Sequence, residues 1–272
     1  MRRSLQVIAL AAAFAGAAAS AAPDRAAIEA AVAAPTRTAE HRARDAHRHP
    51  ADTLAFFGIR PDMQVVEIWP GGAGWYTEIL APLLKDGGGL TVAIPGDQVD
   101  QFREAILAAN ERFLEKLESD PATYGHVRVT RLWAPGQVDI AEPGSADAVL
   151  TFRNLHNWMR WGQVEATLAA IHRALRPGGI LGVTDHRAPS GQPADPQARN
   201  GYVNQAQAIE LIQAAGFEFV GSSEVNANPK DTANHPRGVW TLPPTLMLGD
   251  QDREKYEAIG ESDRFTLLFR KP

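Results

Sequence analysis

A carboxylate followed by a glycine-rich turn is the feature of this sequence that most directly indicates chemistry. An apolar run carries Glu67 near its end, Gly71, Gly72 and Gly74 follow, and the segment 76–84 is compatible with a helix. Glycine has no Cβ, so a loop of this kind lets a ligand approach the backbone amides closely. In open α/β sheets a nucleotide-like ligand binds here, beyond the carboxyl end of the first strand. The spacing differs from the G-x-G-x-x-G dinucleotide fingerprint.

Polar side chains that can handle protons follow two later apolar runs. Asn154 and His156 come after the run 146–152, and Asp185 and His186 end the next one. The carboxyl ends of parallel strands meet at the ligand-binding edge of a sheet, so these residues are expected near one another. A histidine titrates close to neutral pH and can act as a general base. A purely structural role for either histidine is the alternative.

The elements that must position these residues alternate between strand and helix. We expect strands at 64–69, 90–94, 127–132, 146–152, 180–185, 217–225 and 264–270, and helices at 76–84, 99–118, 163–175 and 204–215. A turn is expected at 176–179. This alternation predicts an α/β fold with a mostly parallel sheet and helices on both faces. An N-terminal helical arm, residues 22–58, is expected to precede the main domain, residues 59–272.

The N-terminus predicts export. Residues 1–21 have the form of a secretory signal peptide: Arg2 and Arg3 supply the positive charge, 7–19 is uncharged and rich in alanine, and Ala19-Ser20-Ala21 fits the cleavage rule. The expected location is the periplasm, without stable membrane insertion after cleavage. An uncleaved anchor and a twin-arginine export route are the alternatives.

Composition excludes several classes of function. The chain has 272 residues, 44% of them hydrophobic, a net charge of -5 and no cysteine. The charge predicts no nucleic-acid partner, and the lack of cysteine excludes disulfides and thiolate chemistry. His41, His47, Arg48 and His49 of the arm form either a lid over the site or a weak metal patch. We predict no metal centre, since no ligand spacing supports one.

Several segments together resemble the class I S-adenosyl-L-methionine (SAM) dependent methyltransferases. The segment from Glu67 to Thr77 is similar to their first motif, and 146–152 (ADAVLTF) is similar to their fourth strand. The turn at 174–181 (ALRPGGIL) and the segment 214–217 (AAGF) resemble those before strands five and six. The sequences WPGG, WYT and ESDR, which begin at 69, 75 and 261, resemble an exported bacterial group of predicted methyltransferases.

The resemblance implies a Rossmann-like, doubly wound seven-stranded sheet with the order 3-2-1-4-5-7-6, in which the last strand is antiparallel. It implies that SAM is the cofactor and that the residues binding it are Glu67, Pro70, Gly71, Gly72, Gly74, Asp97 and Asn154. The candidate proton-handling residues are His156, Asp185 and His186. The expected partner is a small-molecule acceptor that lies between 154–158, 185–187 and the arm.

The sequence departs from the family pattern at its centre. Trp69 stands where the motif has its first glycine, so its indole must point away from the ligand or reshape the pocket. Asp97 is the nearest acid after the second strand, where it would bind the ribose or cap a helix. Export also separates the protein from SAM, which is made in the cytosol. A non-catalytic, exported ligand-binding protein on the same scaffold is therefore the alternative function.

Overall fold

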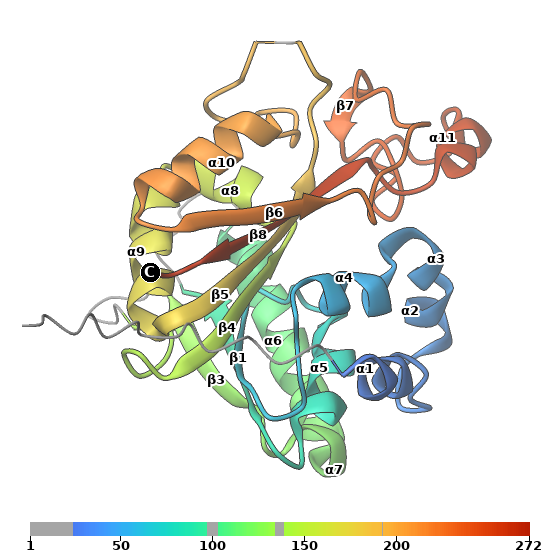
Figure 1. The fold of residues 1–272 in the computed structure, drawn as a ribbon. Helices are drawn as coiled ribbons and strands as arrows, with labels where there is room; N and C mark the ends of the chain where they lie inside the picture. The colour runs from blue at the N-terminus through green and yellow to red at the C-terminus, as the bar shows by residue number, and fades with distance from the viewer. Residues whose placement is uncertain (1–23, 97–102, 134–138, 192) are drawn as a thin grey trace, which may run out of the picture.

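The computed structural model describes residues 24–96, 103–133, 139–191 and 193–272. Its centre is a seven-stranded sheet with the order β3-β2-β1-β4-β5-β8-β6 (Figure 1). The strands are β1 (Gln64–Ile68), β2 (Gly89–Pro95), β3 (Arg128–Leu132), β4 (Ala146–Phe152), β5 (Leu175–His186), β6 (Glu218–Ser223), β7 (Pro236–Val239) and β8 (Arg264–Arg270). Only β8 runs antiparallel to its neighbours in the sheet. The predicted fold class and strand order are confirmed, with β8 as the seventh strand of the sheet.

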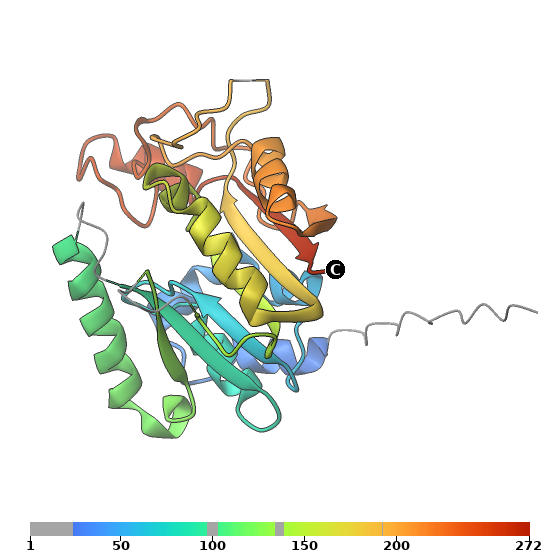
Figure 2. The same cartoon turned by 90° about the vertical axis from the view of Figure 1, so that its left-hand side faces the viewer.

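Helices cover both faces of this sheet (Figures 1 and 2). They are α1 (Arg25–Val32), α2 (Ala39–Ala43), α3 (Asp45–Arg48), α4 (Pro50–Phe56), α5 (Thr77–Leu84), α6 (Arg103–Ser119), α7 (Pro121–Tyr124), α8 (Leu155–Arg160), α9 (Val164–Ala174), α10 (Gln205–Ala214) and α11 (Arg253–Ile259). Figure 2 shows α9 crossing the sheet and α6 at the end that carries β2 and β3. Among the described helices, none is long and apolar enough to cross a membrane.

The core is divided by the sheet because alternate strand residues point to opposite faces. Val66 and Val149 belong to the cluster that also holds apolar residues of α9 and α10. Val65 and Leu150, their neighbours in the chain, belong to the cluster that includes residues of α1, α4 and α5. The central strands are thus buried on both sides, as parallel strands usually are.

The N-terminal helices are attached to the domain through Trp75. The Trp75 indole N–H donates to the carbonyl of His41 at 3.1 Å. The guanidinium of Arg48 lies over the indole, 4.6 Å from the ring centroid. His41 Nδ1 lies 2.8 Å from a carboxylate oxygen of Glu78 on α5. These contacts hold α2 and α3 against the segment that follows the glycine loop.

Some predicted elements differ from the observed ones. The expected turn at 176–179 lies inside β5, which begins at Leu175. Gly178 there has φ +78° and its N–H donates to the carbonyl of Lys271, while the β4–β5 register shifts between Ala146 and Ala148. The residues of the predicted turn therefore form the irregular beginning of β5. The predicted signal peptide 1–21, Asp97 and the start of the predicted helix 99–118 lie outside the described residues.

Candidate functional site

Asn154, which the sequence predicts to bind the cofactor, lies where the carboxyl ends of β1 and β4 meet. The buried Asn154 side chain donates to the carbonyl of Ile68 at 2.9 Å and to Thr151 Oγ1 at 3.1 Å. Glu67 pairs with Leu150 in the β1–β4 register. The side chain of Asn154 therefore joins the end of the first strand to the loop that follows the fourth.

A small cavity of about 220 Å³ opens at this junction. Of the predicted cofactor-binding residues, Glu67, Pro70, Gly71 and Asn154 all line it. Of the predicted N-terminal lid, Arg48 also lines it. The structure therefore brings residues of β1, the glycine loop, the β4 end and α3 to one cavity.

The three glycines of the loop have different surroundings. Gly71 has φ +70° and open space where a side chain would begin, on the cavity side. A Cβ on Gly72 would lie 3.2 Å from the carbonyl oxygen of Ala109, and one on Gly74 would lie 2.8 Å from the ring of Phe113. Both neighbours belong to α6. Close packing of α6 therefore explains Gly72 and Gly74, and only Gly71 faces the cavity.

Glu67 is buried and has one side-chain hydrogen bond, from Thr77 Oγ1 at 2.7 Å. Burial raises the pKa of Glu67 to about 7, although Thr77 and Lys116 act in the opposite direction. Within the described residues, the Glu67 carboxyl group forms no ion pair. It is therefore poised to ionise when a cation arrives.

Trp69, directly after β1, has a backbone conformation that is uncommon for a bulky residue. Its φ is +50°, in the left-handed region that glycine adopts most easily. The indole packs against Trp133 and Trp161, with ring centroids 5.7 and 5.3 Å away. It also lines the small cavity. Trp69 therefore forms part of the cavity wall.

His156 and Asp185 form a buried pair at the ends of α8 and β5. His156 Nδ1 lies 2.9 Å from Asp185 Oδ1, and the His156 backbone N–H donates to Oδ2 at 2.9 Å. Since a carboxylate accepts hydrogen bonds, Nδ1 carries the ring proton and Nε2 keeps its lone pair. This is the orientation that a general base requires.

His186 lies beside this pair and is held by a different partner. Its Nδ1 is 2.5 Å from Ser262 Oγ, and its ring centroid is 5.1 Å from that of His156. Burial, together with His156 and Arg153, lowers the pKa of His186 well below its usual value. The imidazole of His186 is therefore neutral. Both histidines line a second small cavity of about 190 Å³.

The ligand atoms of His156, Asp185 and His186 lie within 4.8 Å of one another, close enough to hold a metal ion. The oxygens of Asp185 already accept three hydrogen bonds, two from His156 and one from the His186 N–H. Positive charge on Arg153 also lowers the pKa of His186, which indicates a field unfavourable to a cation. The cluster therefore already forms a hydrogen-bonded network that can hold or pass a proton.

The sequence analysis missed Arg153 and Glu261. Arg153 follows β4 with φ +63° and lines both small cavities. Within the described residues, no hydrogen bond or ion pair engages its guanidinium, and burial lowers its pKa to about 10. Glu261 is 4% exposed and binds three arginines, Arg44 at 2.7 Å, Arg48 at 3.0 Å and Arg264 at 3.1 Å. The ESDR sequence that contains Glu261 was noticed only as part of a resemblance.

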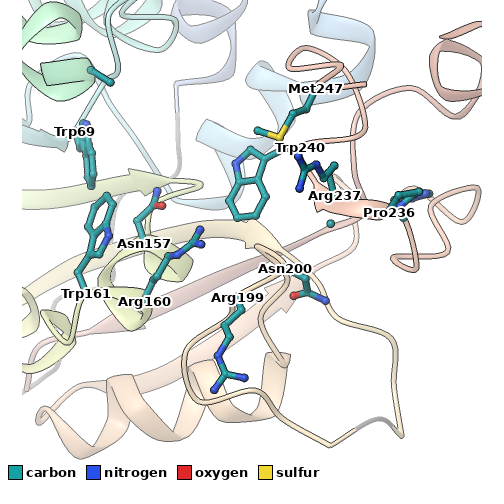
Figure 3. A pocket seen from close by; sticks show the side chains of 13 residues that line it. Trp69, Asn157, Arg160, Trp161, Arg199, Asn200, Pro236, Arg237, Trp240 and Met247 are labelled. Atoms are coloured by element: carbon teal, nitrogen blue, oxygen red, sulfur yellow. The ribbon is translucent and has the colours of Figure 1, made fainter. Parts of the chain in front are cut away.

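The small cavities adjoin a larger one of about 700 Å³ (Figure 3). Asn157, on α8, lines all three. Trp69 is shared by the large cavity and the one at Glu67, and Trp240 by the large cavity and the one at His156. The three spaces therefore lie side by side and share walls along the carboxyl edge of the sheet.

No protein-family model matches the sequence, and no curated protein matches it either. Solved structures do resemble the fold. A SAM-dependent methyltransferase from Aquifex aeolicus has a TM-score of 0.54 at 14% identity, over 92% of this chain and 99% of that one. An arsenic(III) S-adenosylmethionine methyltransferase from Chlamydomonas reinhardtii has a TM-score of 0.50 at 15% identity, over 92% and 74%.

The [4+2]-cyclase SpnF also resembles this chain, with a TM-score of 0.51 at 19% identity over 82% of each chain. The fold is thus shared by proteins named for methyl transfer and by one named for cyclisation, so it does not by itself determine the reaction. What the likeness establishes is architecture: the chain has the fold of the class I SAM-dependent methyltransferases.

Proposed function

We propose that the protein is a SAM-dependent methyltransferase acting on a small-molecule acceptor. The observation that carries the proposal is the charged lining of the cavity at Gly71, which includes the carboxyl group of Glu67 and the guanidinium groups of Arg48 and Arg153. The amino-acid end of SAM has an ammonium and a carboxylate. A carboxyl group and guanidinium groups are the partners that these two charges require. The residues present therefore fit that end of the cofactor.

Bound SAM would supply an electrophilic methyl group, so the chain must hold the acceptor in line with it. A protonated acceptor also needs a base. His156 Nε2 has the free lone pair for this task, and Asp185, 2.9 Å from Nδ1, would stabilise the imidazolium that forms. His186, kept neutral by burial, lines the same cavity without adding charge.

The proposal also includes export to the periplasm. Its support is the pattern of Arg2, Arg3 and the alanine-rich stretch that ends at Ala21. Mass spectrometry of the protein from fractionated cells tests this point. A mature N-terminus at Ala22 in the periplasmic fraction is expected, whereas an intact N-terminus in the cytosol would contradict it.

Calorimetric titration with SAM and S-adenosylhomocysteine tests the cofactor assignment. The protein is first unfolded and refolded to remove any carried ligand, and micromolar binding is expected. The Gly71→Val variant should weaken binding by at least about tenfold, because the added side chain enters the cavity. Gly144→Val is the matched control: Gly144 also has φ +70° and open space around it, but does not line the cavity.

Absence of binding up to millimolar concentrations would contradict the proposal. It would leave the alternative, an exported ligand-binding protein on this scaffold. Equal losses in the two glycine variants would show that backbone strain, rather than occupation of the cavity, weakens binding. Once an acceptor is found, His156→Asn should lower kcat by about 10²-fold or more without changing SAM affinity.

A further inference from the structure

The walls of the large cavity differ in chemistry from those of the small ones. On one side lie Trp69 and Trp161, with ring centroids 5.3 Å apart and an interplanar angle of 32°. Trp240 lies across from them (Figure 3). Aromatic faces at such positions suit a flat apolar body, since ring stacking adds to the effect of buried area.

Arginines border the same space. Arg160 lies over the Trp240 ring, 5.5 Å from its centroid, and Arg199 and Arg237 stand nearby (Figure 3). No aspartate or glutamate is among the described residues that line the cavity. Within the described residues, none of these guanidinium groups forms an ion pair with a carboxylate. The Arg199 guanidinium donates to Gln197 at 3.0 Å, and the Arg199 backbone N–H donates to Asp195 at 3.0 Å. The described residues that line the cavity thus carry positive charge and no carboxylate.

One carboxylate behind the wall, that of Asp231, is held by other groups of the fold. Asp231 lies next to His235, a lining residue, and accepts a hydrogen bond from it at 2.8 Å. Its oxygens also accept from Tyr202 Oη and from the N–H groups of Ala233 and Asp263. With its acceptor positions filled by the fold, Asp231 is not available to the arginines.

The position of the large cavity connects it to the base. Trp240 lines both the large cavity and the small one at His156, and its ring centroid is 6.1 Å from that of His156. A molecule lying between Trp161 and Trp240 would therefore reach His156 with one end and the arginines with another. This is the geometry of an acceptor site.

We propose that the acceptor is an organic anion: a flat apolar or aromatic body that carries a carboxylate- or sulfonate-type group. The body lies between the Trp69–Trp161 pair and Trp240, and the anionic group is bound by Arg160, Arg199 and Arg237. This inference names the substrate class of the proposed methyltransferase and in that sense rests on it. The binding preference itself does not require SAM and is measured without it.

A matched pair of fluorescent probes tests the preference on the full chain. The probes are 1-anilinonaphthalene-8-sulfonate and N-phenyl-1-naphthylamine, which share the same rings and differ in the sulfonate. Titration of the refolded protein should give a Kd about tenfold lower for the sulfonate, and the difference should shrink as salt is added. Equal affinities, or failure of both probes to bind, would overturn the proposal.

Variants locate the preference in this cavity. Arg199→Gln/Arg237→Gln should reduce the difference between the probes to about twofold or less while the neutral probe still binds. Trp240→Leu should weaken both probes and leave their ratio unchanged. Arg270→Gln is the matched control, an exposed arginine at the opposite end of the sheet, and should alter neither affinity. A preference that survives the double variant would place the anion elsewhere and overturn the assignment.

The result is separable from that of the SAM titration. An anion preference in a protein that does not bind SAM would support the cavity and contradict the methyltransferase. SAM binding without an anion preference would overturn the acceptor class alone. Thermal unfolding of each variant establishes that the loss of a probe reflects the removed side chain.

Discussion

Two groups of arginines lie near the carboxyl edge of the sheet, and they differ in burial and pairing. The first group surrounds Glu261 and is mostly buried: Arg44, Arg48 and Arg264. The second borders the large cavity and is more exposed: Arg160, Arg199 and Arg237. A buried cation must be paired to be tolerated, whereas an exposed one is solvated by water. The first group therefore supports the fold, although its Arg48 also lines the cavity at Glu67, and the second is free to bind a ligand.

The largest expected effect comes from removing the carboxylate of the first group. Glu261→Gln leaves Arg44, Arg48 and Arg264 close together without a counter-charge, so the free energy of unfolding should fall by about 3–5 kcal/mol. Chemical denaturation measures it. Glu257→Gln, which removes an exposed partner of Arg253, should change it by less than about 1 kcal/mol. Similar small losses in both variants would contradict the assigned role of the first group.

The pH dependence of stability follows from the same carboxylate. Burial alone would raise the pKa of Glu261, but Arg48 and Arg264 outweigh it and hold that pKa below its usual value of 4.5. A depressed pKa contributes stability that is present above pH 4.5 and is lost as the pH falls further. The native protein should therefore lose stability on acidification below that point more steeply than Glu261→Gln.

Arg153 lies between the two groups and shares a property with each. It is enclosed like the first group, and its guanidinium lacks a partner like the second. Arg153→Met should therefore weaken SAM binding by about tenfold to a hundredfold, the loss of a charged hydrogen bond. Stability should stay the same or rise, because an unpaired enclosed cation is removed. Calorimetry and thermal unfolding measure the two effects. Arg131→Met, on exposed β3, is the control, and unchanged SAM affinity in Arg153→Met would contradict the role.

The sequence predicted the part of the site that depends on strand ends. Glu67, Asn154 and His156 follow or end apolar runs, and parallel strands bring such residues together at one edge. Asp185 could be paired with His156 on the same reasoning. The position of these residues along the chain is sufficient to predict that they meet, because a parallel sheet places the carboxyl ends of its strands at the same edge.

The other residues of the site are brought together by tertiary contacts that the local sequence does not encode. Arg48 and Glu261 are 213 positions apart and meet only after the N-terminal helices pack near the start of β8. In the sequence, Gly72 and Gly74 cannot be distinguished from Gly71. In the structure, α6 packs against both of them and leaves no room for a larger side chain. Whether a glycine serves a ligand or a neighbouring helix is decided by tertiary packing.

The titration of the buried Glu67 should change the free energy of unfolding by less than the removal of the Glu261 carboxylate does. Burial raises its pKa to about 7 from 4.5, so the folded state holds a proton that the unfolded state has lost. Stability should therefore fall as the pH rises between these values. From pH 6 to 8 the native protein should lose about 1 kcal/mol relative to Glu67→Gln, which has no such proton. Denaturation at the two pH values checks it, and parallel behaviour of the two proteins would contradict it. Saturating SAM should reduce the loss, because a bound ammonium favours the ionised form.

The smallest expected change in stability tests most directly the difference between the two groups of arginines. Arg199→Gln/Arg237→Gln should change the free energy of unfolding by less than about 0.5 kcal/mol, since neither side chain supports the fold through a carboxylate. Denaturant unfolding of the double variant beside Glu261→Gln measures this directly. A loss above about 1 kcal/mol would show that these arginines also stabilise the fold, and the distinction between the two groups would fail. A neutral result, together with the loss of anion preference, would mean that these charges act on the ligand alone.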